Sequence, residues 1–383
     1  MSGEDRPQAL RGTVVTPFSV IDDAVVALSA GGIVELVAAS TWSGPTPEPV
    51  GTIAPGFIDM HCHGGGGRSV TTGAPDDIAA VAAHHRSRGT TSLVASMVSG
   101  TQDDLLAGLR GVAEVAAVDA GVIGTHLEGP WLAHGHCGAH DPAVLSHPDV
   151  DVAREWLQAA AGTLRMVTIA PDLPGFAAAA RVLAEAGVLV AAGHTDADTA
   201  TFAAALASDD VATVTHLFNG MAPFHHRDPG PAGATLRALA AGQVHAELIS
   251  DGIHLADETV ALAFGVAPDR IVLISDAMSA AGMPDGQYRL GALDVEVRDA
   301  TAWTTGPTPV LAGSTLHVGE AVRRAITGAG VDPAIAIRAA TTTPAGLLGI
   351  TDRGRVAEGL RADLVVLDED WAVSRVMHGG AWV

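Results

Sequence analysis

Two histidines separated by one residue, His61 and His63, lie at the end of the apolar run PGFIDMHCHGGGG. Side chains alternate between the two faces of a strand, so both imidazoles would point to the same side. Two imidazoles placed in this way can bind one metal ion. The same spacing also occurs beside an ordinary glycine turn. The prediction of a metal site therefore depends on whether the rest of the chain supplies further ligands.

Other apolar runs also end on a polar residue beside a turn sequence. These residues are Glu128, His194, His216 and Asp276. Any one of them alone could instead cap the helix that follows it. Together with His61 and His63 they make four imidazoles and two carboxylates, a set that favours a centre with two metal ions.

The charges of these side chains suggest how they share two ions. Glu128 could bridge the ions with its two oxygens, while His61 and His63 hold one ion and His194 and His216 hold the other. Imidazole with carboxylate suits zinc, with iron, manganese, cobalt or cadmium as alternatives. Asp276 could take the proton of a metal-activated water and pass it to a leaving group, which makes it the expected general base and acid.

The segments that would position these residues are eight short runs rich in valine and isoleucine. They are APGFIDMHCHG, TSLVASMV, AGVIGTHLEGP, RMVTIAPD, VLVAAGHTD, VATVTHLFNG, VHAELISDG and RIVLISDAM. Alanine-rich amphipathic segments separate them, as expected for buried parallel strands that alternate with helices. We therefore predict an α/β fold with a (β/α)8 TIM-type barrel over residues 55–353, whose site lies at the C-terminal ends of the strands. A doubly wound open sheet is the alternative, but no GxGxxG or Walker sequence supports it.

Both ends of the chain differ from this repeat. Residues 1–54 and 354–383 contain short alternating runs, which predict one small β-sandwich domain built from both termini. Residues 284–310 are expected to form a β-hairpin after the eighth strand, with a mobile loop as the alternative.

The composition limits the classes of partner. The 383 residues carry a net charge of −22, which provides no electrostatic footprint for nucleic acid or an anionic membrane. No long apolar stretch or signal peptide pattern is present in the sequence, so a cytoplasmic location is expected. The two cysteines, Cys62 and Cys137, are expected to be reduced thiols, and Cys137 in HGHCGAH is a candidate for redox sensitivity.

Six motifs in this order resemble the amidohydrolase superfamily and, more narrowly, its N-acetylglucosamine-6-phosphate deacetylase family. They are PGFIDMHCHG, HLEGPW, GHT, THLFNGM, DGIH and SDAM, and the similarity spans nearly the whole chain. HLEGPW and THLFNGM are specific to the family, whereas HxH is common to the superfamily. Some members have Gln and Asn at the first pair and bind one metal. The two histidines at this pair in the present chain therefore imply two metal ions.

The resemblance also implies roles for individual residues. Glu128, His194 and His216 match metal ligands, Asp276 matches the catalytic carboxylate, and His140 matches the residue that assists at the acetyl carbonyl. The residues that match sugar phosphate contacts are Ala139, His140, Asn219, Gly220, Arg227, Asp251, His254, Leu311, Ala312, Gly313 and Ser314. In the family the arginine reaches the site of the neighbouring subunit, which implies a homodimer. Arg227 lies in HHRD, the densest cationic cluster near a predicted strand end, and a guanidinium suits a phosphate. A surface ion pair with Asp228 is the alternative role for Arg227.

The expected reaction is hydrolysis of N-acetyl-D-glucosamine 6-phosphate to D-glucosamine 6-phosphate and acetate. Two alternatives remain open. One is an amidohydrolase reaction on a galactosamine relative, a cyclic amide or an aminated base. The other is a noncatalytic scaffold that keeps the barrel for assembly, which a metal analysis would distinguish because a scaffold need hold no cation.

Overall fold

The computed structural model describes residues 8–17, 19–29 and 31–383. Its central feature is an eight-stranded parallel sheet in which each strand pairs with the next one in sequence. The strands are β5 (Phe57–Cys62), β8 (Thr90–Val98), β9 (Val122–Glu128), β10 (Leu164–Ile169), β11 (Leu189–Ala192), β12 (Val211–Val214), β13 (His245–Leu248) and β14 (Ile271–Leu273). A parallel bridge between Cys62 and Ala277 joins the first strand to the segment after the last. The expected barrel fold is confirmed.

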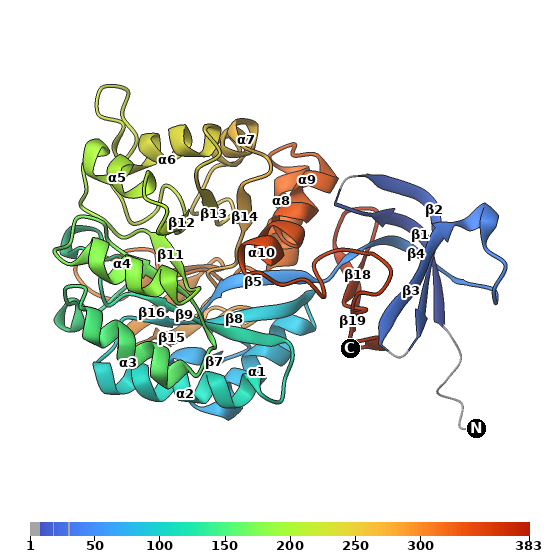
Figure 1. Ribbon diagram of the computed structural model, residues 1–383, viewed down its shortest axis with the longest axis horizontal. Helices are drawn as coiled ribbons and strands as arrows, with labels where there is room; N and C mark the ends of the chain where they lie inside the picture. Colours follow the sequence, from blue (N-terminus) through green and yellow to red (C-terminus); the bar gives the residue numbers. More distant parts are fainter. Residues whose placement is uncertain (1–7, 18, 30) are drawn as a thin grey trace.

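Helices follow these strands in turn and pack around the sheet (Figure 1). They are α1 (Pro75–Arg86), α2 (Gln102–Ala116), α3 (Val150–Ala160), α4 (Phe176–Glu185), α5 (Thr199–Leu206), α6 (Gly230–Ala240), α7 (Asp257–Val266) and α8 (Val318–Thr327), with α9 (Pro333–Ala339) and α10 (Thr342–Leu347) after them. Short 3-10 turns are η1 (Ala39–Thr41), η2 (Val70–Thr72), η3 (His134–His136) and η4 (Pro142–Val144). Side chains cap several helices, for example Thr101, which accepts from Asp104 N at the start of α2. In the described residues, no helix is long and apolar enough to cross a membrane.

Both ends of the chain form a second sheet beside the barrel (Figure 1). Its strands are β1 (Gln8–Val15), β2 (Val20–Ser29), β3 (Gly32–Ala38), β4 (Glu48–Pro55), β18 (Leu364–Leu367), β19 (Val373–His378) and β20 (Ala381–Trp382). The order β20-β19-β18-β4-β1-β2-β3 places the C-terminal strands next to β4. Leu10, Ile53, Leu364 and Met377 belong to its separate apolar core. The fold class with a terminal β-domain is confirmed, although hydrogen bonds link all of these strands into one sheet. Residues 1–7, 18 and 30 of the predicted domain lie outside the described residues.

The segment after β14 forms a small antiparallel sheet of β15 (Gly286–Leu290), β16 (Leu293–Arg298) and β17 (Thr301–Thr304). The expected hairpin therefore has a third strand, because the chain turns again at residues 299–300 and pairs back on β16. Leu290 and Val295 pack with Met278 and Ala312, so this sheet rests on the segments that follow β14. A second short hairpin, β6 (Gly64–Gly65) with β7 (Arg68–Ser69), follows His63 directly.

Candidate active site

Six polar side chains meet at the C-terminal ends of five barrel strands. His61 lies on β5 and His63 just after it, Glu128 ends β9, and the other three follow β11, β12 and β14 by two or three residues. Parallel strands of a barrel end on the same side, so residues far apart in sequence converge there. All six side chains are buried: His61, His63, Glu128, His194, His216 and Asp276.

Three of these residues adopt a backbone conformation that is rare for residues other than glycine. The φ angles are +47° at His194, +26° at His216 and +49° at Asp276. Such left-handed residues cost free energy and persist where the surrounding structure holds them. Hydrogen bonds hold the turns, for example from Asp276 N to His61 O at 2.9 Å and from Ala133 N to His194 O at 2.9 Å. The sharp turns direct each side chain into the mouth of the barrel.

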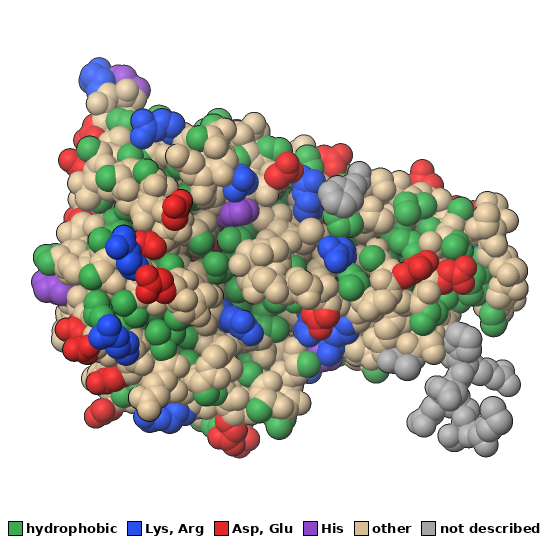
Figure 2. Space-filling view, in the orientation of Figure 1, with side chains coloured by type: hydrophobic (Ala, Val, Ile, Leu, Met, Phe, Trp, Pro, Cys, Tyr) green, Lys and Arg blue, Asp and Glu red, His purple; other side chains and the backbone are tan. Residues whose placement is uncertain are grey.

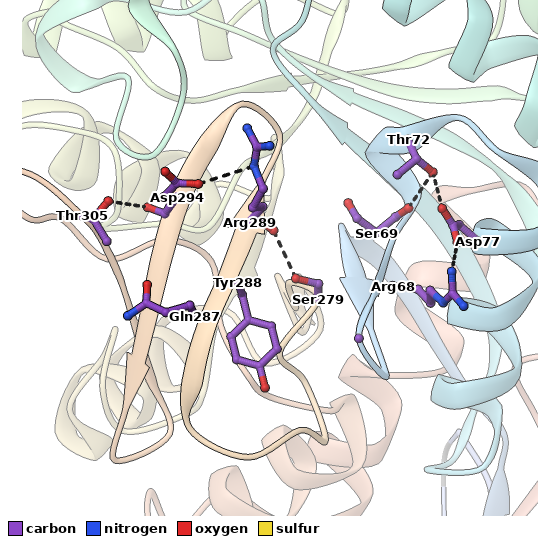
Figure 3. Close-up of a pocket in the computed structure, with 11 residues that line it drawn as sticks. Arg68, Ser69, Thr72, Asp77, Ser279, Gln287, Tyr288, Arg289, Asp294 and Thr305 are labelled. Carbon is purple, nitrogen blue, oxygen red and sulfur yellow. Dashed lines mark hydrogen bonds and ion pairs between the residues drawn. The ribbon is translucent and has the colours of Figure 1, made fainter.

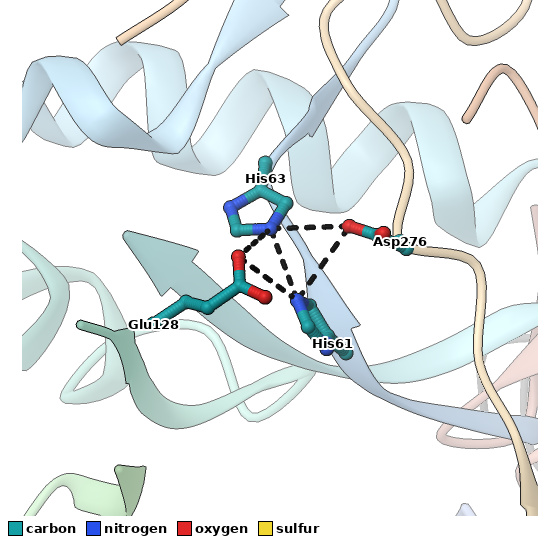
Figure 4. A group of neighbouring side chains, drawn as sticks. All are labelled: His61, His63, Glu128 and Asp276. Carbon is teal, nitrogen blue, oxygen red and sulfur yellow. Dashed lines mark hydrogen bonds and ion pairs between the residues drawn. The ribbon is translucent and has the colours of Figure 1, made fainter. Parts of the chain in front are cut away.

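The first group of possible metal ligands consists of His61, His63, Glu128 and Asp276 (Figure 4). The Nε2 atoms of His61 and His63 are 3.0 Å apart. His63 Nε2 lies 3.1 Å from Glu128 Oε2 and 3.2 Å from Asp276 Oδ1. The corresponding distances from His61 Nε2 are both 3.5 Å. Four possible ligand atoms therefore surround one point.

The second group consists of Glu128, His194 and His216. The Nε2 atoms of both histidines lie 3.0 Å from Glu128 Oε1 and 3.0 Å from each other. Glu128 thus turns one oxygen toward each group. This is the arrangement expected of a carboxylate that bridges two cations.

The Nδ1 atoms of His63 and His194, on the side of each ring away from Glu128, form hydrogen bonds that indicate whether the site suits a metal. His63 Nδ1 lies 3.0 Å from the carbonyl oxygen of Ser96, and His194 Nδ1 lies 2.8 Å from that of His136. A carbonyl oxygen only accepts, so each Nδ1 carries a hydrogen and each ring turns its Nε2 inward, where a bound cation would take the place of a second proton. The Nε2 atoms of His61 and His63, and those of His194 and His216, face each other at 3.0 Å and repel unless a cation or a proton lies between them. The donor set therefore fits divalent metal ions.

The electrostatics of the site favour positive charge. Burial lowers the pKa of His61, but Glu128, Asp276 and Glu247 raise it well above the usual value. Burial also lowers the pKa of His63, and hydrogen bonds to Asp276 and Glu128 raise it to about 9. Burial raises the pKa of Asp276, whereas His61 and His63 lower it to about 2, so this carboxylate is ionised. The pKa of Glu128 is also well below its usual value, because the imidazoles outweigh burial.

His140 is placed to donate a hydrogen bond into this site. Its Nδ1 accepts from the backbone N–H of Ser99 at 3.2 Å, so the hydrogen of the neutral ring is on Nε2. Nε2 lies 3.3 Å from Glu128 Oε2. Burial lowers the pKa of His140, which favours the neutral ring. A neutral imidazole N–H at this position can stabilise an oxyanion.

A cavity of about 320 Å³ is lined by five of the six side chains, all except His61. Among the expected substrate contacts, those that line it are Ala139, His140, Asn219, Gly220, His254, Leu311 and Gly313. Asp251 lies behind His254 and accepts from its Nδ1 at 2.7 Å. Ala312 is buried in the apolar cluster under β15–β17, and the Ser314 hydroxyl donates to Ser275 O. These three residues can support the cavity but do not line it.

Arg227 lies away from the cavity of its own chain. It is exposed on the loop between β12 and α6, which projects from the barrel (Figure 1). Basic and histidine side chains gather at the tip of this loop (Figure 2). The guanidinium donates to His226 Nε2 at 2.9 Å, and Phe224 on the same loop is 53% exposed. Arg227 therefore does not line the cavity of its own chain.

Several residues of the site were not predicted from the sequence. Gly138, Leu290 and Val310 also line the cavity, and Leu290 reaches it from the end of β15. Ser99 and Glu247 contact site residues from behind. Only Glu247 had a signal in the sequence, as a lone charge within the apolar run VHAELIS. Burial raises the pKa of the Cys137 thiol, which disfavours the reactive thiolate.

A larger hollow of about 660 Å³ lies between the β6–β7 hairpin and the β15–β17 sheet (Figure 3). Its charged side chains are already paired. Arg68 donates to Asp77 at 2.9 Å, and Arg289 lies 3.6 Å from Asp294. None of the six metal-site side chains lines this hollow. The smaller cavity is therefore the candidate active site.

Comparisons with known proteins place the chain in a family. The model of the amidohydrolase family matches residues 52–383. The chain therefore belongs to the amidohydrolase family. Within it, the chain groups with the N-acetylglucosamine-6-phosphate deacetylases, which confirms the resemblance found in the motifs.

The individual relatives support this grouping. The chain is 36% identical over 341 residues to N-acetylglucosamine-6-phosphate deacetylase of Bos taurus, a match that covers 86% of this chain and 83% of the relative. It is 35% identical over 334 residues to N-acetylgalactosamine-6-phosphate deacetylase of Escherichia coli O157:H7, with 86% of each chain covered. A mutant N-acetyl-D-glucosamine-6-phosphate deacetylase from Mycobacterium smegmatis, solved in complex with N-acetyl-D-glucosamine-6-phosphate, is 39% identical, with a TM-score of 0.92. That match covers 98% of this chain and 99% of the other.

Proposed function

We propose that this chain hydrolyses the acetamide of N-acetyl-D-glucosamine 6-phosphate to acetate and D-glucosamine 6-phosphate. The observation that carries the proposal is the arrangement of two ligand groups around Glu128, with the His140 N–H beside them. Its support from relatives is the match over 98% of the chain to the Mycobacterium smegmatis structure, whose ligand is this sugar phosphate.

Two divalent ions per subunit, zinc by preference, would be held by the six buried side chains. His61, His63 and Asp276 would hold one, His194 and His216 the other, with Glu128 between them. When bound, such ions lower the pKa of a water toward about 7 and polarise a carbonyl oxygen. Elemental analysis of the purified protein should find close to two equivalents of metal per subunit, whereas a noncatalytic scaffold need hold none.

The side chains of the protein would carry the proton and position the amide. Asp276 is ionised, so it can accept the proton of the attacking water and then deliver it to the departing amine nitrogen. His140 would donate from Nε2 to the acetyl oxygen as negative charge develops there. Asn219, His254 and the Leu311–Gly313 segment line the rest of the cavity and would hold the sugar phosphate.

Proton NMR tests the proposed substrate. The metal-loaded protein is incubated with N-acetylglucosamine and N-acetylgalactosamine, each with and without the 6-phosphate, and free acetate is followed. We expect acetate from N-acetylglucosamine 6-phosphate, its loss after chelation, and its return when metal is restored. The Escherichia coli relative makes the galactosamine phosphate the second candidate. Acetate from neither phosphate would refute the proposal.

We also propose a homodimer in which Arg227 reaches the active site of the partner subunit. Its support is the exposed position of Arg227 on a projecting loop, outside the cavity of its own chain. Arg227→Ala and Asp276→Asn should each be poorly active alone. After subunit exchange, the mixed dimer should regain activity, because one site then has both Asp276 and a partner arginine. Mixtures that stay inactive despite exchange would contradict the arrangement.

A cytoplasmic location stays a prediction.

A further inference from the structure

Glu247 is a buried carboxylate that the mechanism above does not use. It lies on β13 with no exposed surface, among the side chains below the metal ligands. A buried charge is costly unless it is paired or hydrogen-bonded. In the described part of the chain, its only ion-pair partner is His61. The position of this carboxylate therefore requires an explanation.

One oxygen of Glu247 contacts both ligand groups. Oε2 accepts from His61 Nδ1 at 3.1 Å. The same oxygen accepts from the backbone N–H of His216 at 3.3 Å. His61 belongs to the first ligand group and His216 to the second. Glu128 links the two groups from the side of the cavity, and Glu247 links them from below.

The contact with His61 sets how this ring presents its lone pair. A carboxylate that accepts from Nδ1–H leaves Nε2 free of hydrogen and makes the ring a stronger ligand. The other histidines with such support use neutral carbonyl oxygens, Ser96 O for His63 and His136 O for His194. His61 is thus the ligand supported by a full negative charge.

The contact with His216 acts on the backbone. His216 has a φ of +26°, a strained conformation, and its Nδ1 has no hydrogen-bond partner among the described residues. The ring of His216 therefore lacks the support that the other three rings have. The hydrogen bond from its N–H to Glu247 holds the turn that aims this ring at Glu128.

We propose that Glu247 is a positioning residue shared by both metal sites, which orients His61 for one ion and fixes the backbone of His216 for the other. This inference rests on the metal-dependent function proposed above. It predicts that loss of Glu247 weakens the binding of both metal ions together. Loss of a residue that supports a single ligand would weaken the binding of only one ion.

The test compares Glu247→Gln and Glu247→Ala with Thr213→Val as the matched control. Thr213 is buried on the adjacent strand β12, and its hydroxyl has no partner among the described residues. Valine has nearly the same shape, so this change alters the barrel interior without touching a ligand. Zinc dissociation constants are measured by competition with a chromophoric chelator. The melting temperatures of the metal-free proteins show whether each variant is folded.

We expect Glu247→Ala to lower the affinity for both zinc ions by about 10–100-fold. Glu247→Gln keeps an acceptor oxygen but loses the negative charge, so it should mainly lower the affinity for the zinc ion at His61. Thr213→Val should bind zinc like the unchanged protein. The proposal would be overturned if Glu247→Ala kept its zinc affinity, or if its affinity fell for only one of the two ions. If Glu247→Ala does not fold, unchanged affinity at the His61 site in Glu247→Gln is the overturning result.

The measurement separates this inference from the proposed substrate because it uses zinc and no sugar. If the unchanged protein binds two zinc ions but releases no acetate, the proposed reaction fails and the role of Glu247 stands. If the unchanged protein binds no zinc, the role of Glu247 is overturned as well.

Discussion

Glu128 presents its two oxygens to two different pairs of histidines, and this single residue sets the spacing of the centre. Oε1 lies 3.0 Å from both His194 and His216, whereas Oε2 lies 3.1 Å from His63. The neighbouring imidazoles keep the carboxylate ionised despite its burial. Ligand geometry at this scale depends on contacts between strands that are distant in sequence.

Asp276 is expected to contribute more to proton transfer than to metal binding. In Asp276→Asn, His61, His63 and Glu128 still surround the first ion, so most of the metal should remain bound. The amide cannot accept the proton of water, and turnover should fall by about 10²–10⁴-fold. The measurements are acetate release and metal content per subunit.

The control for Asp276→Asn is the melting temperature of the loaded variant, which should stay close to that of the unchanged protein. A variant that keeps full turnover would show that Asp276 is not the proton carrier. A variant that loses both ions would show that its main role is ligation.

At the level of elements, the approach of α2 to the turn after the β6–β7 hairpin depends on glycine. The hairpin itself follows His63 directly, and Val70 N, at the start of the turn, donates to His63 O at 2.9 Å. Gly111 on α2 faces Gly73 at the end of this turn. A Cβ at Gly111 would lie 2.0 Å from the Gly73 carbonyl oxygen, which is backbone and cannot move independently. The close contact fixes α2 against the segment that follows His63.

Gly111→Ala is therefore expected to destabilise the protein, although alanine favours helices. The clash should cost about 1–3 kcal/mol of unfolding free energy. The matched control is Gly265→Ala on α7, where a Cβ would meet no atom within 4 Å. That change should stabilise by up to about 1 kcal/mol. Urea unfolding of both variants measures the difference, and a stabilising Gly111→Ala would contradict the packing.

At the scale of the whole molecule, several histidines are fully or partly buried and are held in the neutral form. Burial lowers the pKa of His85 to about 3 and, together with Arg270, that of His245 to about 4. Burial and His61 lower the pKa of His126 well below its usual value. Above the usual pKa of 6.5, the folded and unfolded chains carry the same charge on these groups. Below it, the unfolded chain binds protons that the folded chain does not.

The free energy of unfolding should consequently fall as the pH drops from about 6.5 toward 4. Urea unfolding at a series of pH values measures the slope. His245→Gln should flatten it, because this variant removes one group that protonates only in the unfolded chain. His245 touches no metal ligand, so the comparison is independent of metal binding. Equal slopes in both proteins would contradict a neutral His245.

The sequence predicted the barrel because eight apolar runs alternate with amphipathic helices, and each run coincides with a strand. It also pointed to all six side chains that the structure brings together, since each lies at the end of such a run beside a turn. It did not reveal Ser99, Leu290 or Glu247. Ser99 and Leu290 are ordinary residues in sequence, and their contacts arise only when the Leu290 turn and the Ser99 loop reach the mouth of the barrel.

The sequence by itself determined the order of strands and helices, the buried aliphatic core and the set of possible metal ligands, because these follow from local periodicity and residue type. The tertiary structure decided which oxygen of Glu128 faces which histidines, that Glu247 contacts both groups of possible ligands, and that Arg227 lies outside the cavity of its own chain. These facts are distances between residues on different strands and loops. Only the closed barrel fixes such distances.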